Sequence, residues 1–429
     1  MDRISHLPEG ILHKIMSMLP EEDVAETLVL SKTWFRTWSS FPFLDFDESQ
    51  TSIYYDVEKY GIDDIMWERR NTFYNFVDKS LLRFQNQGSN IKQIKLSLIN
   101  KVAYPRIDYW MKLASKCGVE VLHIKFMDED PLSPDTRSPR LFPNGNKFVR
   151  ECYDIPSSLL EIKSLINLSL ERCFLFDQGH LNHPIKLSSL KVLCLRRVEF
   201  RDKQVFQNLL ASCPSIEYIT LYSCYGIDYV SMHDLSKLKG VTIVQCSSIM
   251  AGLEVDAPSL ENFHLHLQGN IYERAKTTIK IDKCMNLNKL FMKSLKLSDE
   301  WFLQHRHIFT LLQTLELRYC IMPTVINMSF PQLKVIKLEM CDTLEKAYID
   351  APNLNLCDYT KYYHGGNFPS ISFLNCSSES KINVNLFIRG GAWNFLKLRE
   401  FFQEFKCTNI SAILHICSSP YGVVSVFIT

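Results

Sequence analysis

A short pattern of leucines, written L-x-x-L-x-L, recurs along most of the chain, with Ile, Val, Met or Phe sometimes replacing leucine. Residues 164–173, SLINLSLERC, are one copy, and LKVLCLRRV and LQTLELRYC are two others. The second half of each copy alternates apolar and polar residues, which is the period of a β-strand with one buried face. We therefore expect a short strand in each copy, with its leucines pointing into a core.

The copies follow one another at regular intervals, and this regularity predicts a repeat architecture. The eight clear copies, 21 to 27 residues apart, begin at Leu165, Leu190, Ile216, Leu238, Leu260, Leu287, Leu312 and Leu333. Weaker copies begin at Ile91, Val119 and Leu354. Such a period and core are typical of leucine-rich repeats, whose units bury their apolar faces only against their neighbours. The sequence thus predicts an α/β fold, a solenoid with a curved parallel sheet and a helical or irregular outer side.

All but one of the clear copies close, eight residues after the first position, on a small or apolar residue. In five copies this residue is a cysteine: Cys173, Cys224, Cys246, Cys320 and Cys341. Because cysteine alternates here with aliphatic residues, we interpret it as a small buried hydrophobe with a weak S–H donor. A disulfide ladder and a metal site are the alternatives, although the sequence contains no CxxC pair that would favour zinc.

The first 46 residues do not fit the repeat and predict a small helical module instead. Pro8 suits the first turn of a helix. The apolar residues that follow it at helical spacing are Ile11, Leu12, Ile15, Met18 and Leu19. Pro20 ends this helix, and Trp34 and Trp38 lie four residues apart on one helical face. A module of about 40 residues has only a marginal core of its own, so we expect it to pack against a partner.

This stretch resembles an F-box, and the chain from about residue 2 to 376 resembles the plant-type F-box/leucine-rich-repeat family. The residues that carry the resemblance are Leu7, Pro8, Ile11, Leu12, Ile15, Leu19, Pro20, Asp23, Val24, Val29, Leu30, Ser31, Lys32, Trp34, Trp38, Leu44, Asp45 and Phe46. The stretch CPSIEYITLYSC and two Asp-Ala-Pro segments, at 256–258 and 350–352, are also similar to that family. The chain departs from it at Gly10, where the family usually has glutamate. Glycine in a first helical turn costs up to about 1 kcal/mol.

The resemblance implies a three-helix F-box that docks on a Skp-type adaptor and, through it, on a cullin–RING ubiquitin ligase. The positions expected to contact the adaptor are Leu7, Pro8, Ile11, Leu12, Ile15, Leu19, Val24, Leu30, Trp34 and Trp38. The chain would then be a non-catalytic substrate-recognition subunit of an SCF-type E3 ligase. The alternative is a repeat scaffold without ubiquitylation, whose N-terminal helices only cover the open end of the array.

The polar positions of the repeated strands predict a binding surface for a target protein. Outward residues alternate with the leucines, and the side chains expected to contact the target are Glu171, Arg196, Tyr222, His266, Lys293 and Arg318. Tyrosine and arginine are enriched at binding hot spots, and the concave sides of solenoids are their usual binding surfaces. An ordinary solvated sheet face is the alternative for any single one of these residues.

The pattern divides the chain into an F-box at 1–43, an array at 44–376 and a C-terminal α/β cap at 377–429. The array is expected to begin as strand, helix and strand over 44–100. A mobile loop is expected at about 128–148, where the repeat spacing is too long and prolines cluster. After Cys376 the pattern changes to one helix and two strands, and a truncated family C-terminus is the alternative to a cap.

Composition and charge exclude some classes of function but do not indicate a specific chemistry. The 429 residues are 46% hydrophobic and carry a net charge of +1, so no basic excess points to nucleic acid. The N-terminal residues lack the apolar region of a signal peptide, and no apolar run approaches a membrane span. We therefore expect an intracellular protein of the cytoplasm or nucleus. No catalytic motif or cofactor site is found, and the pairs His264/His266 and His305/His307 are interpreted as surface features.

Overall fold

The protein forms two compact units, residues 1–214 and 215–429. The computed structural model describes residues 4–19, 31–50, 62–99, 104–127, 153–175, 185–246, 249, 251–268, 277–363, 368–377, 379–389, 395–403, 405, 409–419 and 422–428. The loop expected at about 128–148 lies outside the described residues.

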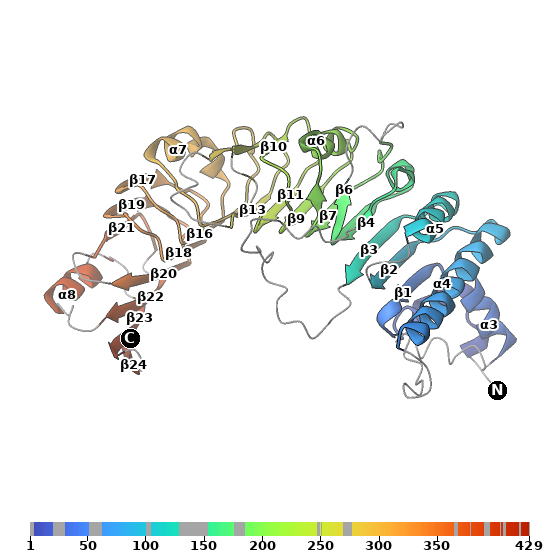
Figure 1. Ribbon diagram of the computed structural model, residues 1–429. Helices are drawn as coiled ribbons and strands as arrows, with labels where there is room; N and C mark the ends of the chain where they lie inside the picture. Colours follow the sequence, from blue (N-terminus) through green and yellow to red (C-terminus); the bar gives the residue numbers. More distant parts are fainter. Residues whose placement is uncertain are drawn as a thin grey trace. The chain divides into compact units, whose positions relative to one another are not determined.

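The first unit begins with short helices and continues as a parallel sheet. Its described helices are η1 (Ile4–His6), α1 (Glu9–Met16), α3 (Lys32–Ser39), η2 (Glu48–Gln50), α4 (Ile62–Gln87), α5 (Tyr104–Lys116), η3 (Ser157–Glu161) and α6 (Lys203–Ala211). The strands that pair in parallel are β1 (Phe43–Asp47), β2 (Gln93–Ile99), β3 (Val121–Met127), β5 (Asn167–Glu171) and β7 (Val192–Arg196). Helices α4 and α5 lie side by side along β1, β2 and β3 (Figure 1). A second, smaller sheet joins β4 (Tyr153–Asp154), β6 (Cys173–Leu175) and β8 (Glu199–Phe200).

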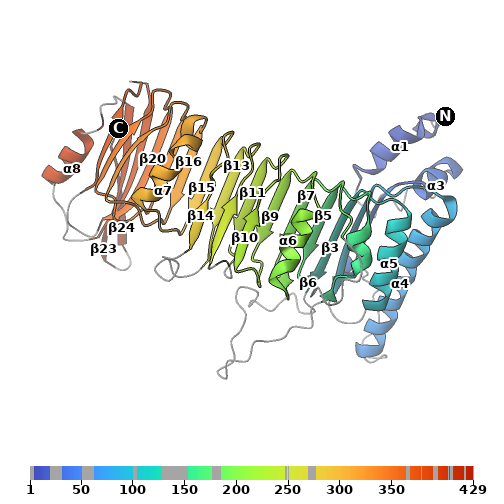
Figure 2. The same ribbon diagram turned by 90° about the horizontal axis from the view of Figure 1, so that it is seen from above.

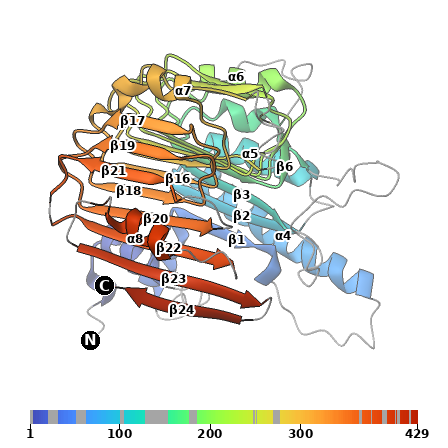
Figure 3. The ribbon, with the colours of Figure 1, turned by 90° about the vertical axis from the view of Figure 1, so that its left-hand side faces the viewer.

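The second unit continues the same construction. Its main sheet joins, in order, β9 (Tyr218–Tyr222), β11 (Gly240–Val244), β13 (Asn262–His266), β15 (Lys289–Lys293), β16 (Thr314–Arg318), β18 (Val335–Glu339), β20 (Leu356–Tyr363), β22 (Lys381–Arg389), β23 (Asn409–Ser419) and β24 (Gly422–Ile428). Only the last pair, β23 with β24, is antiparallel, as the opposed arrows in Figure 3 show.

Two small parallel sheets and the helices that the structure describes there complete this unit. The small sheets join β10 (Tyr229–Met232), β12 (Gly252–Val255) and β14 (Thr278–Lys280), and then β17 (Val325–Ser329), β19 (Lys346–Asp350) and β21 (Ser370–Leu374). The helices are α7 (Asp299–Gln304), η5 (Arg306–Thr310) and α8 (Phe395–Gln403). The predicted α/β fold of F-box helices followed by leucine-rich repeats is thereby confirmed.

The alternation expected within each strand is present. In β13 the side chains of Phe263 and Leu265 are buried, while His264 and His266 are half-buried on the other face. Strand β13 pairs with β11 and β15 without a register shift, so Leu265 lies beside Ile243 on one side and Met292 on the other. Leucine positions of successive repeats therefore stack in rows, and no repeat has to bury its apolar face alone.

At the end of seven of the repeat strands, the chain turns through a residue in the left-handed region. The residues immediately before the closing position have φ between 50° and 60°: Arg172, Arg197, Ser223, Gln245, Ser294, Tyr319 and Met340. The turn directs the closing side chain inward, and Cys320 and Cys341 are both buried there. The Cys320 thiol donates to the carbonyl oxygen of Arg318 at 3.4 Å. The five closing cysteines are buried and form no disulfide with one another, which agrees with the small-hydrophobe interpretation and not with a disulfide ladder.

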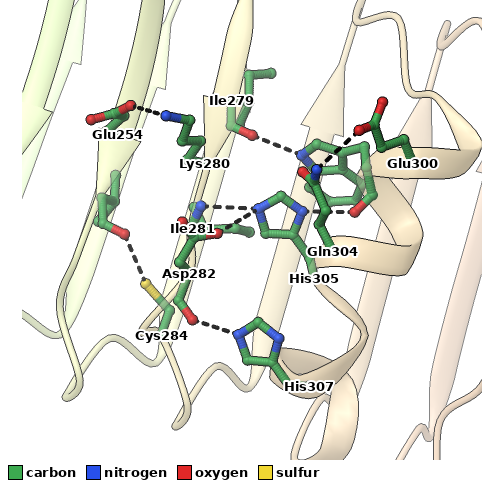
Figure 4. A network of polar contacts seen from close by, with 12 residues as sticks. Glu254, Ile279, Lys280, Ile281, Asp282, Cys284, Glu300, Gln304, His305 and His307 are labelled. Carbon is green, nitrogen blue, oxygen red and sulfur yellow. Dashed lines mark hydrogen bonds and ion pairs between the residues drawn. The ribbon is translucent and has the colours of Figure 1, made fainter.

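One of the paired histidines is part of the core, so its interpretation as a surface feature was wrong. His305 follows α7, is 1% exposed and stacks on the Trp301 ring at 4.6 Å. Its Nδ1 donates to the Trp301 carbonyl oxygen at 2.7 Å, and its Nε2 accepts from the backbone N–H of Ile281 at 3.3 Å (Figure 4). Asp282 Oδ1 also lies 3.3 Å from Nε2. The neutral ring therefore satisfies a backbone donor that the neighbouring repeat leaves unpaired.

Replacing His305 with leucine is expected to destabilise the chain by about 1–3 kcal/mol, because the N–H of Ile281 would lose its acceptor. Burial lowers the pKa of His305, against the opposing effects of its hydrogen bond to Trp301 and of Asp282. The unfolded chain thus takes up this proton first, so the stabilisation is present above about pH 6.5 and is lost as the pH falls. Urea unfolding at pH 7.5 and 5.5 measures both effects. An equal loss of stability on acidification in His305→Leu and in the wild type would contradict this role.

Candidate binding surfaces

The F-box module has its own small core, and several residues expected to contact the adaptor lie in it. Leu12, Met16, Trp34 and Phe41 are buried together, and the partly buried Ile15, Leu19 and Trp38 pack against them. Helix α3 is fixed at its start because the backbone N–H of Trp34 donates to Ser31 Oγ at 3.3 Å. Leu12 and Trp34 therefore hold the module together in this structure. Val24 and Leu30 lie outside the described residues.

Other apolar side chains of the same module face solvent. Leu7 is 39% exposed, Ile11 is 46% exposed, and Pro8 is also exposed. Sequence reasoning missed Phe35 and Met18, whose side chains are 54% and 70% exposed. For Phe35 a signal was available: it directly follows the buried Trp34, and consecutive helical residues point about 100° apart, so it does not share the buried side of α3. These side chains form the exposed apolar set of the module, namely Leu7, Ile11, Met18 and Phe35.

Polar contacts fix α1 against α3. His13 Nε2 donates to the carbonyl oxygen of Thr37 at 3.0 Å and lies 3.2 Å from Ser40 Oγ. The Ser40 hydroxyl in turn donates to the Glu9 carboxylate. The edge of the His13 ring meets Phe41 at 5.6 Å between ring centres. The exposed apolar set is thus carried by two helices whose relative position is held by hydrogen bonds as well as by the core.

Trp38 has a partner within the chain that the sequence did not indicate. The guanidinium of Arg83, near the end of α4, lies 4.4 Å from the centre of the Trp38 ring. Helix α3 lies beside this end of α4 in Figure 2. Burial lowers the pKa of Arg83. This cation–π contact joins the F-box module to the first helix of the array and occupies one face of a ring that was expected to contact the adaptor.

Gly10 lies on the exposed side of α1 with open space around it. A Cβ added there would meet no atom within 4 Å. Gly10 therefore destabilises α1 through its low helix propensity and not through steric crowding. A longer side chain such as glutamate fits at this position.

The residues expected to contact a target are placed on outward strand positions. In the first unit Glu171 and Arg196 are directly paired on β5 and β7. In the second unit His266, Lys293 and Arg318 occupy one row across β13, β15 and β16. Tyr222 belongs to that same row, two strands before His266, with Val244 between them. The alternation of the strands thus brings the last four residues together on one face of the second unit.

The electrostatics of this row differ from what the residue types alone suggest. Burial, the charge of Lys293 and then His264 lower the pKa of His266 to about 4. His266 is therefore neutral at pH 7 and offers a hydrogen bond, not a charge. The ammonium of Lys293 lies 5.3 Å from the centre of the Tyr319 ring, so part of its charge is already engaged by an aromatic face.

Further along the same face, the charged side chains pair with each other. Arg318 binds Glu316 at 3.0 Å and Glu339 at 3.3 Å, and Lys337 binds Glu316 at 3.2 Å. The two cations and two anions balance, so this network carries no net charge. Arg318 is thus held in place by its neighbours.

A groove of about 460 Å³ opens beside this network. It is lined by the outward residues of five neighbouring strands, from Arg318 on β16 to Ile413 on β23. Sequence reasoning missed its second half, which is formed by β20, β22 and β23. The signal was weak, because the repeat anchored at Leu354 is incomplete and the segment after Cys376 no longer carries the leucine pattern.

Within the described ranges, no group of three or more His, Cys, Asp or Glu side chains is placed to hold a metal ion. In the same part of the chain, no helix is both long enough and apolar enough to cross a membrane.

Taken together, a helical module with exposed apolar side chains precedes a leucine-rich-repeat array with outward polar rows. Comparisons with known proteins agree with this class. The F-box domain family matches residues 4–46, and the leucine-rich repeats of FBD-associated F-box protein At5g56370 match residues 108–299. The two matches span more than half of the chain, which belongs to the plant-type F-box/leucine-rich-repeat family.

Several similar proteins of Arabidopsis thaliana are named as F-box proteins, and the name of one of them also includes leucine-rich repeats. The FBD-associated F-box protein At5g56380 is 27% identical over 376 residues, which cover 82% of this chain and 75% of that protein. The F-box/FBD/LRR-repeat protein At3g52680 is 31% identical over 221 residues, covering 52% of this chain and 40% of that protein. The putative FBD-associated F-box protein At3g50710 is 27% identical over 412 residues, covering 86% and 87%.

Proposed function

We propose that this chain is a substrate-recognition subunit of an SCF-type E3 ubiquitin ligase. Its F-box module would dock on a Skp-type adaptor, and outward rows of its repeats would bind a target protein. The observation that carries the proposal is the exposed apolar set, Leu7, Ile11, Met18 and Phe35, on a stretch that matches the F-box domain. Apolar side chains gathered on so small a module are typical of a protein interaction site.

The same observation favours docking over a plain cap. A cap would cover these side chains with the chain's own repeats, whereas they remain 39% to 70% exposed. Within the expected adaptor contacts, we propose Leu7, Pro8 and Ile11 as direct contacts. Leu12 and Trp34 would act by supporting the module. Ile15, Leu19 and Trp38 would contact the adaptor through the exposed parts of their side chains. Val24 and Leu30 are proposed as adaptor contacts on the resemblance to the F-box alone.

The proposed mechanism needs no bond chemistry from this chain. Holding a target on the array while the adaptor links the chain to a cullin–RING ligase converts ubiquitin transfer into a reaction between tethered groups. Tethering raises the effective concentration of the target's lysine near the transfer site. The proposed partners are thus two proteins, the adaptor and a target, and the proposed location is the cytoplasm or nucleus. The divisions at 1–43, 44–376 and 377–429 are kept as proposed domain boundaries.

The test is capture of a purified Skp-type adaptor by the full chain. Ile11→Asp should weaken capture at least about 30-fold, because a charge would replace an apolar side chain expected at the centre of the contact. Leu303→Asp is the matched control, since Leu303 on α7 is 63% exposed but lies outside the F-box. Failure of the wild-type chain to capture the adaptor, or equal capture by Ile11→Asp, would overturn the proposal.

A further inference from the structure

The groove of the second unit is built from rows of outward side chains in strict register. One row runs through Lys337, Asp358, Asn383 and Ser411 on β18, β20, β22 and β23. The next row, two residues further along each strand, runs through Glu339, Thr360, Asn385 and Ile413. Figure 3 shows these strands side by side. The parallel pairing thus presents a continuous polar surface, which we call the polar groove.

The charges of the polar groove are not balanced along its length. At the β16 and β18 end, Arg318 and Lys337 are neutralised by Glu316 and Glu339. On β20, the middle strand of the groove, Asp358 accepts a hydrogen bond from Asn383 Nδ2 at 2.6 Å and has no ion pair with a described residue. Ser411 donates to Asn383 Oδ1 at 2.9 Å, which fixes the amide so that its NH₂ group faces Asp358. Asp358 is therefore an oriented, half-buried carboxylate that forms no ion pair among the described residues, since the nearby Lys337 binds Glu316 instead.

An aromatic surface follows the polar groove on the same strands. Tyr362, Phe387 and His415 are in register on β20, β22 and β23, two residues beyond the second polar row. The rings of Tyr362 and Phe387 are 5.1 Å apart, and those of Phe387 and His415 stack at 4.3 Å. Tyr362 is 50% exposed. We call these three residues the aromatic row.

We propose that the polar groove binds a basic side chain of the target at Asp358, and that the aromatic row binds an apolar side chain of the same target segment. This inference rests on the proposed function, because it names the chemistry of the target. A carboxylate in the middle of a groove that forms no ion pair with a described residue favours an arginine or lysine. Neutral amide and hydroxyl groups around it supply hydrogen bonds without competing for that charge.

The geometry also sets the spacing of the two target side chains. Asp358 and Tyr362 are four residues apart on β20, and strand residues rise about 3.3 Å each, so the two subsites are about 13 Å apart. An extended target segment running along the strands would meet them with side chains at positions i and i+4. The side chain at i+2 would then lie over Thr360 and Asn385, where a polar residue is favoured.

The experiment uses the full chain and four synthetic dodecapeptide pools. Positions 4 and 8 carry Arg/Phe, Glu/Phe, Arg/Ala or Glu/Ala, and the other positions are randomised among uncharged residues. The wild type should bind the Arg/Phe pool about tenfold more tightly than the Glu/Phe pool, as a half-buried charge-assisted pair predicts. Asp358→Asn should remove this preference, and Asp358→Arg should reverse it. Tyr362→Ala should remove the preference for Phe over Ala at position 8.

The control is Glu345→Gln, which removes an exposed carboxylate before β19 and should leave every preference unchanged. Equal binding of all pools by the wild type, a wild-type preference for glutamate, or a preserved arginine preference in Asp358→Asn would each overturn the inference. Capture of the Skp-type adaptor is measured on the same preparations. Capture of the adaptor without any peptide preference would contradict this inference alone. A peptide preference without capture of the adaptor would contradict only the ligase assignment.

Discussion

Replacing Trp34 with alanine is expected to unfold the F-box module while the repeats stay folded. Trp34 is 5% exposed and shares a core with Leu12, Met16 and Phe41, so its removal leaves a cavity at the centre of a very small module. Large aromatic side chains removed from cores cost about 3–5 kcal/mol, which is a large share of any small module's stability. Amide hydrogen exchange across α1 and α3, measured in the full chain, should show loss of protection there and not in β9 to β23.

Phe35→Ala is the natural comparison for this variant. Phe35 is adjacent in sequence and is also aromatic, but it is 54% exposed and outside the module's core. Its replacement should leave the exchange pattern of α1 and α3 unchanged and weaken only the capture of the adaptor. Equal protection of these helices in Trp34→Ala and the wild type would show that the core described for the module does not hold it together.

A second large effect is expected for Trp110→Ala in α5. Trp110 is fully buried, its Nε1 donates to Asp78 Oδ1 at 2.5 Å, and its ring meets the edge of Tyr74 at 5.8 Å. The substitution removes the packing between α5 and α4 together with a hydrogen bond to a charged group, so we expect a loss of about 3–5 kcal/mol. Urea unfolding, with hydrogen exchange to locate the change in α4 and α5, measures it.

Tyr109→Ala provides the matched control. Tyr109 precedes Trp110 in the same helix and is 42% exposed, so its removal should change stability by no more than about 0.5 kcal/mol. A comparable loss in both variants would mean that helix propensity, and not the buried indole, governs the stability of this region.

The strands of the array were predictable because apolar and polar residues alternate along each of them in the sequence. The alternation around Leu168 and Leu170 predicts which side chains are buried, and regular spacing predicts that neighbouring copies stack in register. The same alternation correctly placed His266, Lys293 and Arg318 on one outward row. Local patterns suffice here because each repeat meets only its immediate neighbours.

The F-box module was harder to predict residue by residue. Apolar residues occur on more than one side of α1, so helical spacing alone could not separate the buried Leu12 from the exposed Ile11. The contact of Arg83 with Trp38 joins residues 45 positions apart, and no local pattern encodes it. The polar groove escaped prediction for a related reason, because Asp358 and Asn383 belong to strands where the leucine pattern has faded.

The buried thiols that precede two of the repeat anchors, Cys213 before Ile216 and Cys284 before Leu287, have a practical consequence. Desolvation raises the pKa of Cys213 to about 12 and that of Cys284 to about 11, so neither forms the reactive thiolate while its repeat is folded. Cys194 and Cys376 are only half-buried and remain more accessible. Pulsed alkylation with mass spectrometry can therefore time the opening of individual repeats in the unmodified protein. The native cysteines thus report the rate of local opening at several positions along the array.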